Sequence, residues 1–118
     1  MAYVRRYCGP IILDINNGQL RRYCGPVIYE VDRQSTMRKY CGSSIYAFDT
    51  DSIRKYCGPT LMTFRNGEIR RYCGPVIATF DGKYIRQYCG PTLYEVEGYL
   101  TTNELFMLIV YLFILQED

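Results

Sequence analysis

The triplet Tyr-Cys-Gly recurs six times along this 118-residue chain and constrains its fold more than any other feature. A fixed period is the signature of a repeat architecture, in which one small unit folds in the same way each time. Six units of about 16 residues therefore fill positions 3 to 99. The triplets begin at Tyr7, Tyr23, Tyr40, Tyr56, Tyr72 and Tyr88, at intervals of 16, 17, 16, 16 and 16 residues.

Each unit carries two turn signals, which leave about six residues for each connecting segment, a length that suits a strand. The junctions Asn17-Gly18, Asn66-Gly67 and Asp81-Gly82 favour hairpins, because a type I′ turn needs positive φ at both central residues. Within a unit, Gly-Pro fits a type II′ turn in which glycine takes the positive φ. Each unit is therefore predicted to be a β-hairpin, and the chain a meander of about twelve strands.

The predicted turn fixes the pairing of strands within a unit. In the fifth unit, a Gly74-Pro75 loop places Ile69 opposite Phe80, with Arg71 opposite Ala78 and Arg70 opposite Thr79. The face predicted to form the core then carries Ile69, Phe80, Cys73 and Val76, with Arg71 between them.

An open sheet of about twelve short strands would leave two exposed edges. Equal units repeat the same rotation, and no polar capping unit is visible at either end of the repeats. The predicted fold class is therefore mainly β: six tandem hairpins in a closed ring or barrel with pseudo-six-fold symmetry, followed by one apolar α-helix.

The helix is predicted over residues 101–116, in a single domain that comprises residues 1–118. Thr101 and Glu104 form a capping-box pattern, and the eleven residues from Leu105 to Leu115 have no polar face. Such a helix would be ~16 Å long, too short to cross a ~30 Å membrane core. Two ways of burying it stay open: it plugs the ring, or it packs between chains and drives self-association. The side chains predicted to form this core or oligomer contact are Leu105, Leu108, Ile109, Leu112 and Leu115.

Composition excludes several classes of function. Apolar residues make up 48% and charged residues 22%, as in folded proteins. Histidine is absent, which excludes His-dependent triads and His-ligated metal sites. No apolar run of signal-peptide length follows the N-terminus. We therefore expect a cytoplasmic protein, with insertion of the tail into a membrane as the alternative.

The segment Tyr84-Ile85-Arg86-Gln87-Tyr88-Cys89-Gly90, together with Asp81-Gly82, resembles the short hairpin repeats of the bacterial β-flower proteins. The resemblance covers residues 3 to 99. It implies hairpin petals around a central axis, and it implies no biochemical activity, because that family has no established one.

One cysteine stands in each unit. Equivalent positions in neighbouring hairpins lie two strands apart, ~9.6 Å, which exceeds the ~7 Å limit for a disulfide. No Cys-x-x-Cys spacing suggests a metal site. Each thiol is therefore predicted to be a small buried group beside a tight turn, with a metal or redox site as the alternative. The cysteines are Cys8, Cys24, Cys41, Cys57, Cys73 and Cys89.

An arginine also occurs at one position of every unit. The predicted register pairs Arg5 with Asp14, Arg21 with Glu30 and Arg86 with Glu95 as ordinary ion pairs. In the three middle units it places no carboxylate opposite the arginine. These arginines would form a positive strip that binds an anionic ligand or single-stranded nucleic acid, unless they only stack on tyrosines. The candidate binding residues are Arg38, Arg54, Arg70, Tyr40, Tyr56 and Tyr72.

A second basic position follows directly and is predicted to be a solvated rim, because Arg and Lys interchange there. Its residues are Arg6, Arg22, Lys39, Lys55 and Arg71, with Gln87 in the sixth unit.

No nucleophile–base pair, phosphate loop or metal motif is recognisable, so no catalytic residue, metal ligand or cofactor is assigned. The leading hypothesis is a non-enzymatic structural or protein-interaction module built on a rigid ring. The anion or nucleic-acid binder and the thiol metal or redox site remain as alternatives.

Overall fold

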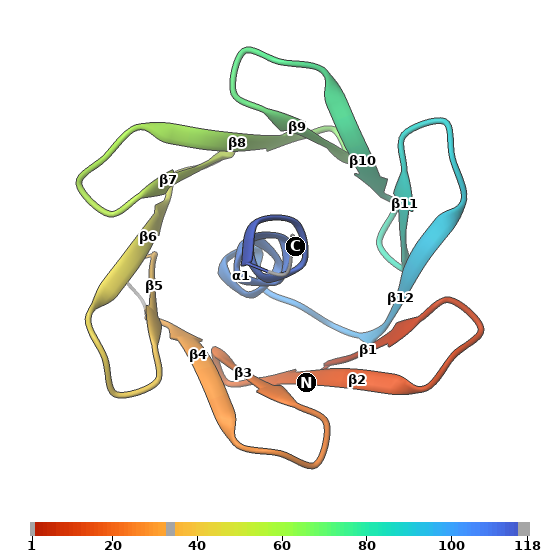
Figure 1. The fold of residues 1–118 in the computed structure, drawn as a ribbon, viewed down its shortest axis with the longest axis horizontal. Coiled ribbons are helices and arrows are strands. Elements are labelled where there is room, and N and C mark those ends of the chain that lie inside the picture. Colours follow the sequence, from red (N-terminus) through yellow and green to blue (C-terminus); the bar gives the residue numbers. More distant parts are fainter. Residues whose placement is uncertain (1, 33–34, 116–118) are drawn as a thin grey trace.

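The computed structural model describes residues 2–32 and 35–115, the last two of them by backbone alone. Within these residues, twelve short strands surround one C-terminal helix (Figure 1). The helix comprises α1 (Thr102–Val110) and a π-helical continuation, η1 (Tyr111–Leu115). The strands are β1 (Ala2–Arg6), β2 (Ile11–Asn16), β3 (Gln19–Arg22), β4 (Val27–Val31), β5 (Thr36–Lys39), β6 (Ser44–Phe48), β7 (Ser52–Lys55), β8 (Thr60–Arg65), β9 (Glu68–Arg71), β10 (Val76–Phe80), β11 (Tyr84–Gln87) and β12 (Thr92–Gly98).

The strands form a closed antiparallel meander. Each strand pairs with its neighbours in sequence, and β1 pairs with β12 to complete the barrel. Figure 1 shows six hairpins that flare outward like petals around the central helix. The prediction of a mainly β fold of closed hairpins with one C-terminal helix is confirmed. Closure leaves no open edge along this sheet, which removes the hazard of edge-to-edge association.

The six petal tips share one turn. In the first, the N–H of Gly9 donates a 2.8 Å hydrogen bond to the carbonyl of Arg6, so Tyr7 and Cys8 are the central residues. Cys8 takes the positive φ, at 58°, and the other five cysteines have φ between 54° and 59°. The prediction that the glycine takes the positive φ is wrong. A side chain at this glycine would instead be crowded, since a Cβ on Gly9 would lie 3.2 Å from the Cβ of Arg6.

The junctions between hairpins follow the sequence signals more closely. Asn17 and Gly18 have φ of 53° and 76°, and the Asn66-Gly67 junction is alike, as a type I′ turn requires. At the third predicted junction only Gly82 has positive φ. There the carboxylate of Asp81 accepts hydrogen bonds from the N–H groups of Lys83 and Tyr84, so an Asp-stabilised turn replaces the type I′ turn.

The pairing predicted within a hairpin is wrong, because the turn is centred two residues earlier than Gly-Pro. In the fifth hairpin Ile69 pairs with Ala78 and Arg70 with Val76, and the register shifts between these two pairs. Ile77 is therefore the extra residue of a bulge. The same shift recurs in every hairpin, always in the second strand.

One position in the first strand of each hairpin, three residues before the tip tyrosine, is fully buried and lines the interior of the barrel. Ile69 is one of these residues, as predicted, but Cys73 is exposed. Val76 and Phe80 are half-buried. Burying each such side chain contributes about 1.5–3 kcal/mol. The lining residues are Val4, Leu20, Met37, Ile53, Ile69 and Ile85.

The helix lies inside this barrel, and its contacts distinguish between plugging the ring and packing between chains. Phe106 has 1% of its surface exposed, and its ring lies 5.5 Å from that of Phe48 and 6.1 Å from that of Phe64. Leu108 and Ile109 are fully buried, Leu112 is 6% exposed and Leu105 is half-buried. Gln116 and the side chain of Leu115 lie outside the described residues. The helix therefore plugs the ring, and the self-association predicted through it stays a prediction.

Candidate binding surfaces

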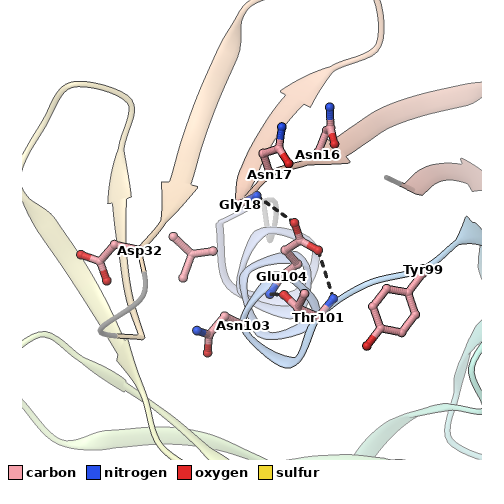
Figure 2. A pocket seen from close by; sticks show the side chains of 9 residues that line it. Asn16, Asn17, Gly18, Asp32, Tyr99, Thr101, Asn103 and Glu104 are labelled. Atoms are coloured by element: carbon pink, nitrogen blue, oxygen red, sulfur yellow. Dashed lines mark hydrogen bonds between the residues drawn. The ribbon is translucent and has the colours of Figure 1, made fainter.

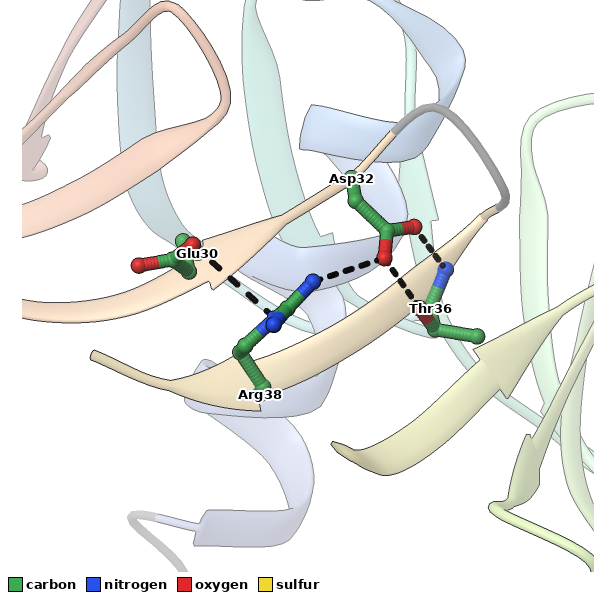
Figure 3. Close-up of polar contacts among 4 residues, drawn as sticks. All are labelled: Glu30, Asp32, Thr36 and Arg38. Atoms are coloured by element: carbon green, nitrogen blue, oxygen red, sulfur yellow. Dashed lines mark hydrogen bonds and ion pairs between the residues drawn. The ribbon is translucent and has the colours of Figure 1, made fainter. Parts of the chain in front are cut away.

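The first arginine position of each unit lies on the outer wall of the barrel, and carboxylates surround most of these side chains. Arg38 is the most fully engaged: its Nη2 lies 2.9 Å from Asp32 and its Nε lies 3.9 Å from Glu30 (Figure 3). Asp32 also accepts hydrogen bonds from the hydroxyl and the N–H of Thr36, at 2.8 Å and 3.1 Å. Arg38 is thus held in a local polar network at the start of the third hairpin.

Arg54 and Arg70 are also paired. Arg54 lies 3.8 Å from Asp49, and Arg70 lies 3.1 Å from Glu68. The expectation that Arg38, Arg54 and Arg70 lack carboxylate partners is therefore wrong, because carboxylates reach them from the same strand, the preceding strand or the junction before it. Anion binding by these arginines together with Tyr40, Tyr56 and Tyr72 stays a prediction. The absence of carboxylate partners, on which that prediction was based, does not hold.

Of the three arginines on this wall for which ion pairs were predicted, two pair with a carboxylate other than the predicted one. Arg5 pairs with Glu97 at 3.0 Å, and Arg21 pairs with Asp14 at 3.4 Å. Glu95, the predicted partner of Arg86, lies 3.7 Å from Lys83 instead. The pairs of Arg5 and Arg21 cross between neighbouring hairpins and help to hold adjacent petals together, whereas the Lys83–Glu95 pair lies within the sixth hairpin.

The second basic position lies on the inner face of the barrel, at the end where the tips lie. Residues directly opposite each other in an antiparallel pair point to the same face. Arg22 is opposite buried Leu13, Lys55 opposite buried Tyr46, and Arg71 opposite buried Met62. We call Arg6, Arg22, Lys39, Lys55 and Arg71 the basic ring. All five side chains are exposed at the barrel mouth, as the predicted solvated rim requires.

A pocket of about 250 Å³ opens in this mouth between the first two hairpins. Its wall combines two members of the basic ring with apolar side chains of β2 and with Tyr111, the first residue of η1. Tyr111 is 7% exposed, and its ring lies 6.0 Å from that of Tyr29. The lining residues are Arg6, Ile11, Ile12, Leu13, Arg22, Tyr23 and Tyr111.

The six tips form a second repeated surface. Their tyrosines are 48–58% exposed, and all six cysteines are free and exposed. The prediction of buried thiols is wrong, because each cysteine occupies the positive-φ position of a turn that projects into solvent. Among the described residues, no three Cys, Asp or Glu side chains are grouped so that they could hold a metal ion.

A larger pocket, of about 710 Å³, lies at the opposite end of the barrel, where the helix begins (Figure 2). Its buried carboxylate, Glu104, accepts hydrogen bonds from the N–H groups of Gly18 at 2.8 Å and Thr101 at 3.0 Å. The hydroxyl of Thr101 in turn accepts a hydrogen bond from the N–H of Glu104, which completes the predicted capping box. These contacts give the carboxylate a structural role.

No protein-family model, curated protein or solved structure matches the chain. The resemblance to β-flower proteins stays a prediction. In the part of the chain that the structure describes, no helix is long and apolar enough to cross a membrane.

Proposed function

We propose that the protein is a non-enzymatic interaction module, a rigid barrel that displays six equivalent petal tips to a partner. The observation that supports this most directly is the repetition of one tip. The same hydrogen-bonded turn, the same positive-φ cysteine and an exposed tyrosine occur in every petal.

The tips are held in place by the barrel. The N–H of Tyr23 donates a hydrogen bond to the carbonyl of Ile12 in the preceding hairpin, and the equivalent bond forms for all six tip tyrosines at 3.0–3.1 Å. The helix packs inside the barrel and forms part of its core. The tips are the surface that the fold repeats in every hairpin.

The chemistry of a tip suits recognition of a protein surface. A tyrosine offers a large contact area at a low cost in conformational entropy, and tyrosine is enriched at interfaces. Six copies on one rigid frame would convert weak contacts into avid binding where the partner presents several matching sites. The free thiols favour a reducing compartment, which supports the cytoplasmic location that we expect.

The proposal is tested by measuring how many tips are needed for binding. Partners captured by the full chain are purified, and their affinity is measured for variants with one, three or six tip tyrosines changed to alanine. We expect the affinity to fall in steps as more tips are changed. Tyr99→Ala is the control, since Tyr99 is 74% exposed but lies outside the tips. Binding that survives all six changes, or that depends on a single tip, would contradict multivalent display.

A further inference from the structure

The side chains of the basic ring differ from the outer-wall arginines in whether they form ion pairs. In the described part of the chain, the side chains of Arg6, Arg22, Lys39 and Lys55 make no ion pair, whereas Arg5, Arg21, Arg38, Arg54 and Arg70 all do. Four of the six positions around the mouth of the barrel thus carry a cation that makes no ion pair with the described residues. Because they lie on the inner face, their fields converge there.

The ring is not uniform around the barrel. Arg6 and Arg22 stand in the first two hairpins, and they are the one neighbouring pair of this ring in which both members are arginines. Both line the same pocket, whose floor is formed by apolar side chains of β2. Guanidinium groups bind oxyanions through paired N–H donors, and an apolar floor strengthens such contacts. The pair of arginines therefore distinguishes this place on the ring from the positions with Lys39 and Lys55 and from the sixth hairpin, where Gln87 carries no charge.

We propose that this pocket, the Arg6–Arg22 pocket, binds a phosphate group of a small phosphate ester or condensed phosphate. Its volume of about 250 Å³ is below the ~300–1,000 Å³ of sites that enclose a whole drug-sized ligand. It therefore takes the phosphate end of a molecule. Lys39 and Lys55, farther along the ring, attract the remaining charge, so tripolyphosphate binds more tightly than a single phosphate.

One opposing effect acts in the same mouth. The pocket lies beside Tyr111, where α1 passes into η1, and η1 continues to Leu115. The carbonyls at a helix C-terminus repel anions weakly. The same carbonyls would be stabilised by the basic ring without any ligand. The experiment must therefore separate ligand binding from stabilisation of the helix.

Inorganic phosphate and tripolyphosphate are titrated calorimetrically into the full chain at low and constant ionic strength. The variant R6Q/R22Q is compared with R54Q/R70Q, which removes the same charge from the outer wall. We expect R6Q/R22Q to weaken tripolyphosphate binding by at least about tenfold, since charge-assisted hydrogen bonds are lost. R54Q/R70Q should stay within about twofold. R6K/R22K keeps the positive charge but loses the paired N–H donors of the guanidinium group, so its affinity for tripolyphosphate should be intermediate.

Three results would overturn the proposal. The first is no saturable binding of either phosphate compound. The second is equal weakening in R6Q/R22Q and R54Q/R70Q, which would mean that net charge alone attracts the anion. The third is binding of a single-stranded oligonucleotide without binding of the free phosphates, which would indicate a nucleic-acid surface. If R6Q/R22Q lowers the melting temperature and phosphate does not bind to wild type, the arginines only stabilise the helix end.

Discussion

The carboxylate of Glu104 accepts a 2.8 Å hydrogen bond from the backbone N–H of Gly18, which lies 86 residues earlier in the chain. One end of the central helix is thereby fixed to the junction between β2 and β3 (Figure 2). Gly18 has φ of 76°, and a Cβ there would lie 2.8 Å from the carbonyl oxygen of Val31, so the junction approaches its surroundings closely. A helix with almost no polar side chains is thus oriented by its one buried carboxylate.

Glu104→Ala should lower the free energy of unfolding by about 2 kcal/mol, because hydrogen bonds to a buried charged group and half of a capping box are lost. Glu104→Gln should lower it less, since an amide oxygen can still accept one of these bonds. The measurement is urea denaturation, with Glu68→Ala as the control at an exposed ion pair. Equal effects at Glu104 and Glu68 would show that the helix is not held at this point.

Gly74→Ala tests whether Gly74 takes the positive φ at its petal tip, and Gly67→Ala is the reference for a glycine that has positive φ. Gly67 has φ of +77° and a Cβ there would lie 2.9 Å from the carbonyl oxygen of Phe80, so alanine should cost about 1–2 kcal/mol of stability. At Gly74 the nearest atom, the Cβ of Arg71, lies 3.4 Å from an added Cβ, and the change should cost less. A larger loss at Gly74, measured by the same denaturation, would restore the turn predicted from Gly-Pro.

The repeat made most of the architecture predictable. The spacing of Tyr72 and its five equivalents gave the number of hairpins, and the apolar run after Leu105 gave a helix with no solvent-exposed face. What the sequence could not decide was which residues of Tyr-Cys-Gly-Pro form the centre of the tip. Gly-Pro satisfies the sequence rules for a type II′ turn, and nothing in the pattern indicates that Cys73, not Gly74, takes the positive φ.

The ion pairs of the arginines were missed because the prediction considered only the residue opposite each arginine within its own hairpin. A turn centred on Gly-Pro leaves Arg70 opposite Thr79, and the bulged hairpin places it opposite Val76. The carboxylate that pairs with Arg70 is Glu68, two residues earlier on the same strand. The alternation of inward and outward side chains along the first strand does not depend on where the turn is centred. Ile69 was therefore correctly predicted to lie on the core face.

All six cysteines should react with a thiol reagent in the native protein, because each lies exposed in a projecting turn. Mass spectrometry after brief labelling without denaturant should show six adducts per chain. The same labelling in urea is the control and should add no further adduct. Fewer than six adducts under native conditions would return the thiols to the buried position predicted from the sequence.

Stability should fall at alkaline pH as two tyrosines of the barrel mouth ionise. Burial, followed by the nearby Tyr111, raises the pKa of Tyr29 above 10.0, and burial, followed by Tyr29, raises the pKa of Tyr46. The fold therefore favours the neutral phenols. Their contribution is fully present below pH 10.0, the ordinary tyrosine pKa, and is lost as the pH rises through the raised pKa values.

Urea denaturation at increasing pH measures this loss. Tyr29→Phe and Tyr46→Phe should each flatten the decline above the ordinary tyrosine pKa, whereas Tyr99→Phe, at a 74% exposed position, should leave it unchanged. An identical decline in all three variants would mean that other groups control the alkaline limit.

The position of the helix inside its own barrel is tested most directly by nuclear Overhauser contacts between aromatic rings. The ring of Phe106 lies 5.5 Å from that of Phe48 and 6.1 Å from that of Phe64. In a mixture of isotope-labelled and unlabelled chains, we expect contacts between Phe106 and both rings within one chain. Contacts found only between different chains, or no contact with either ring, would show that the helix lies outside the barrel of its own hairpins.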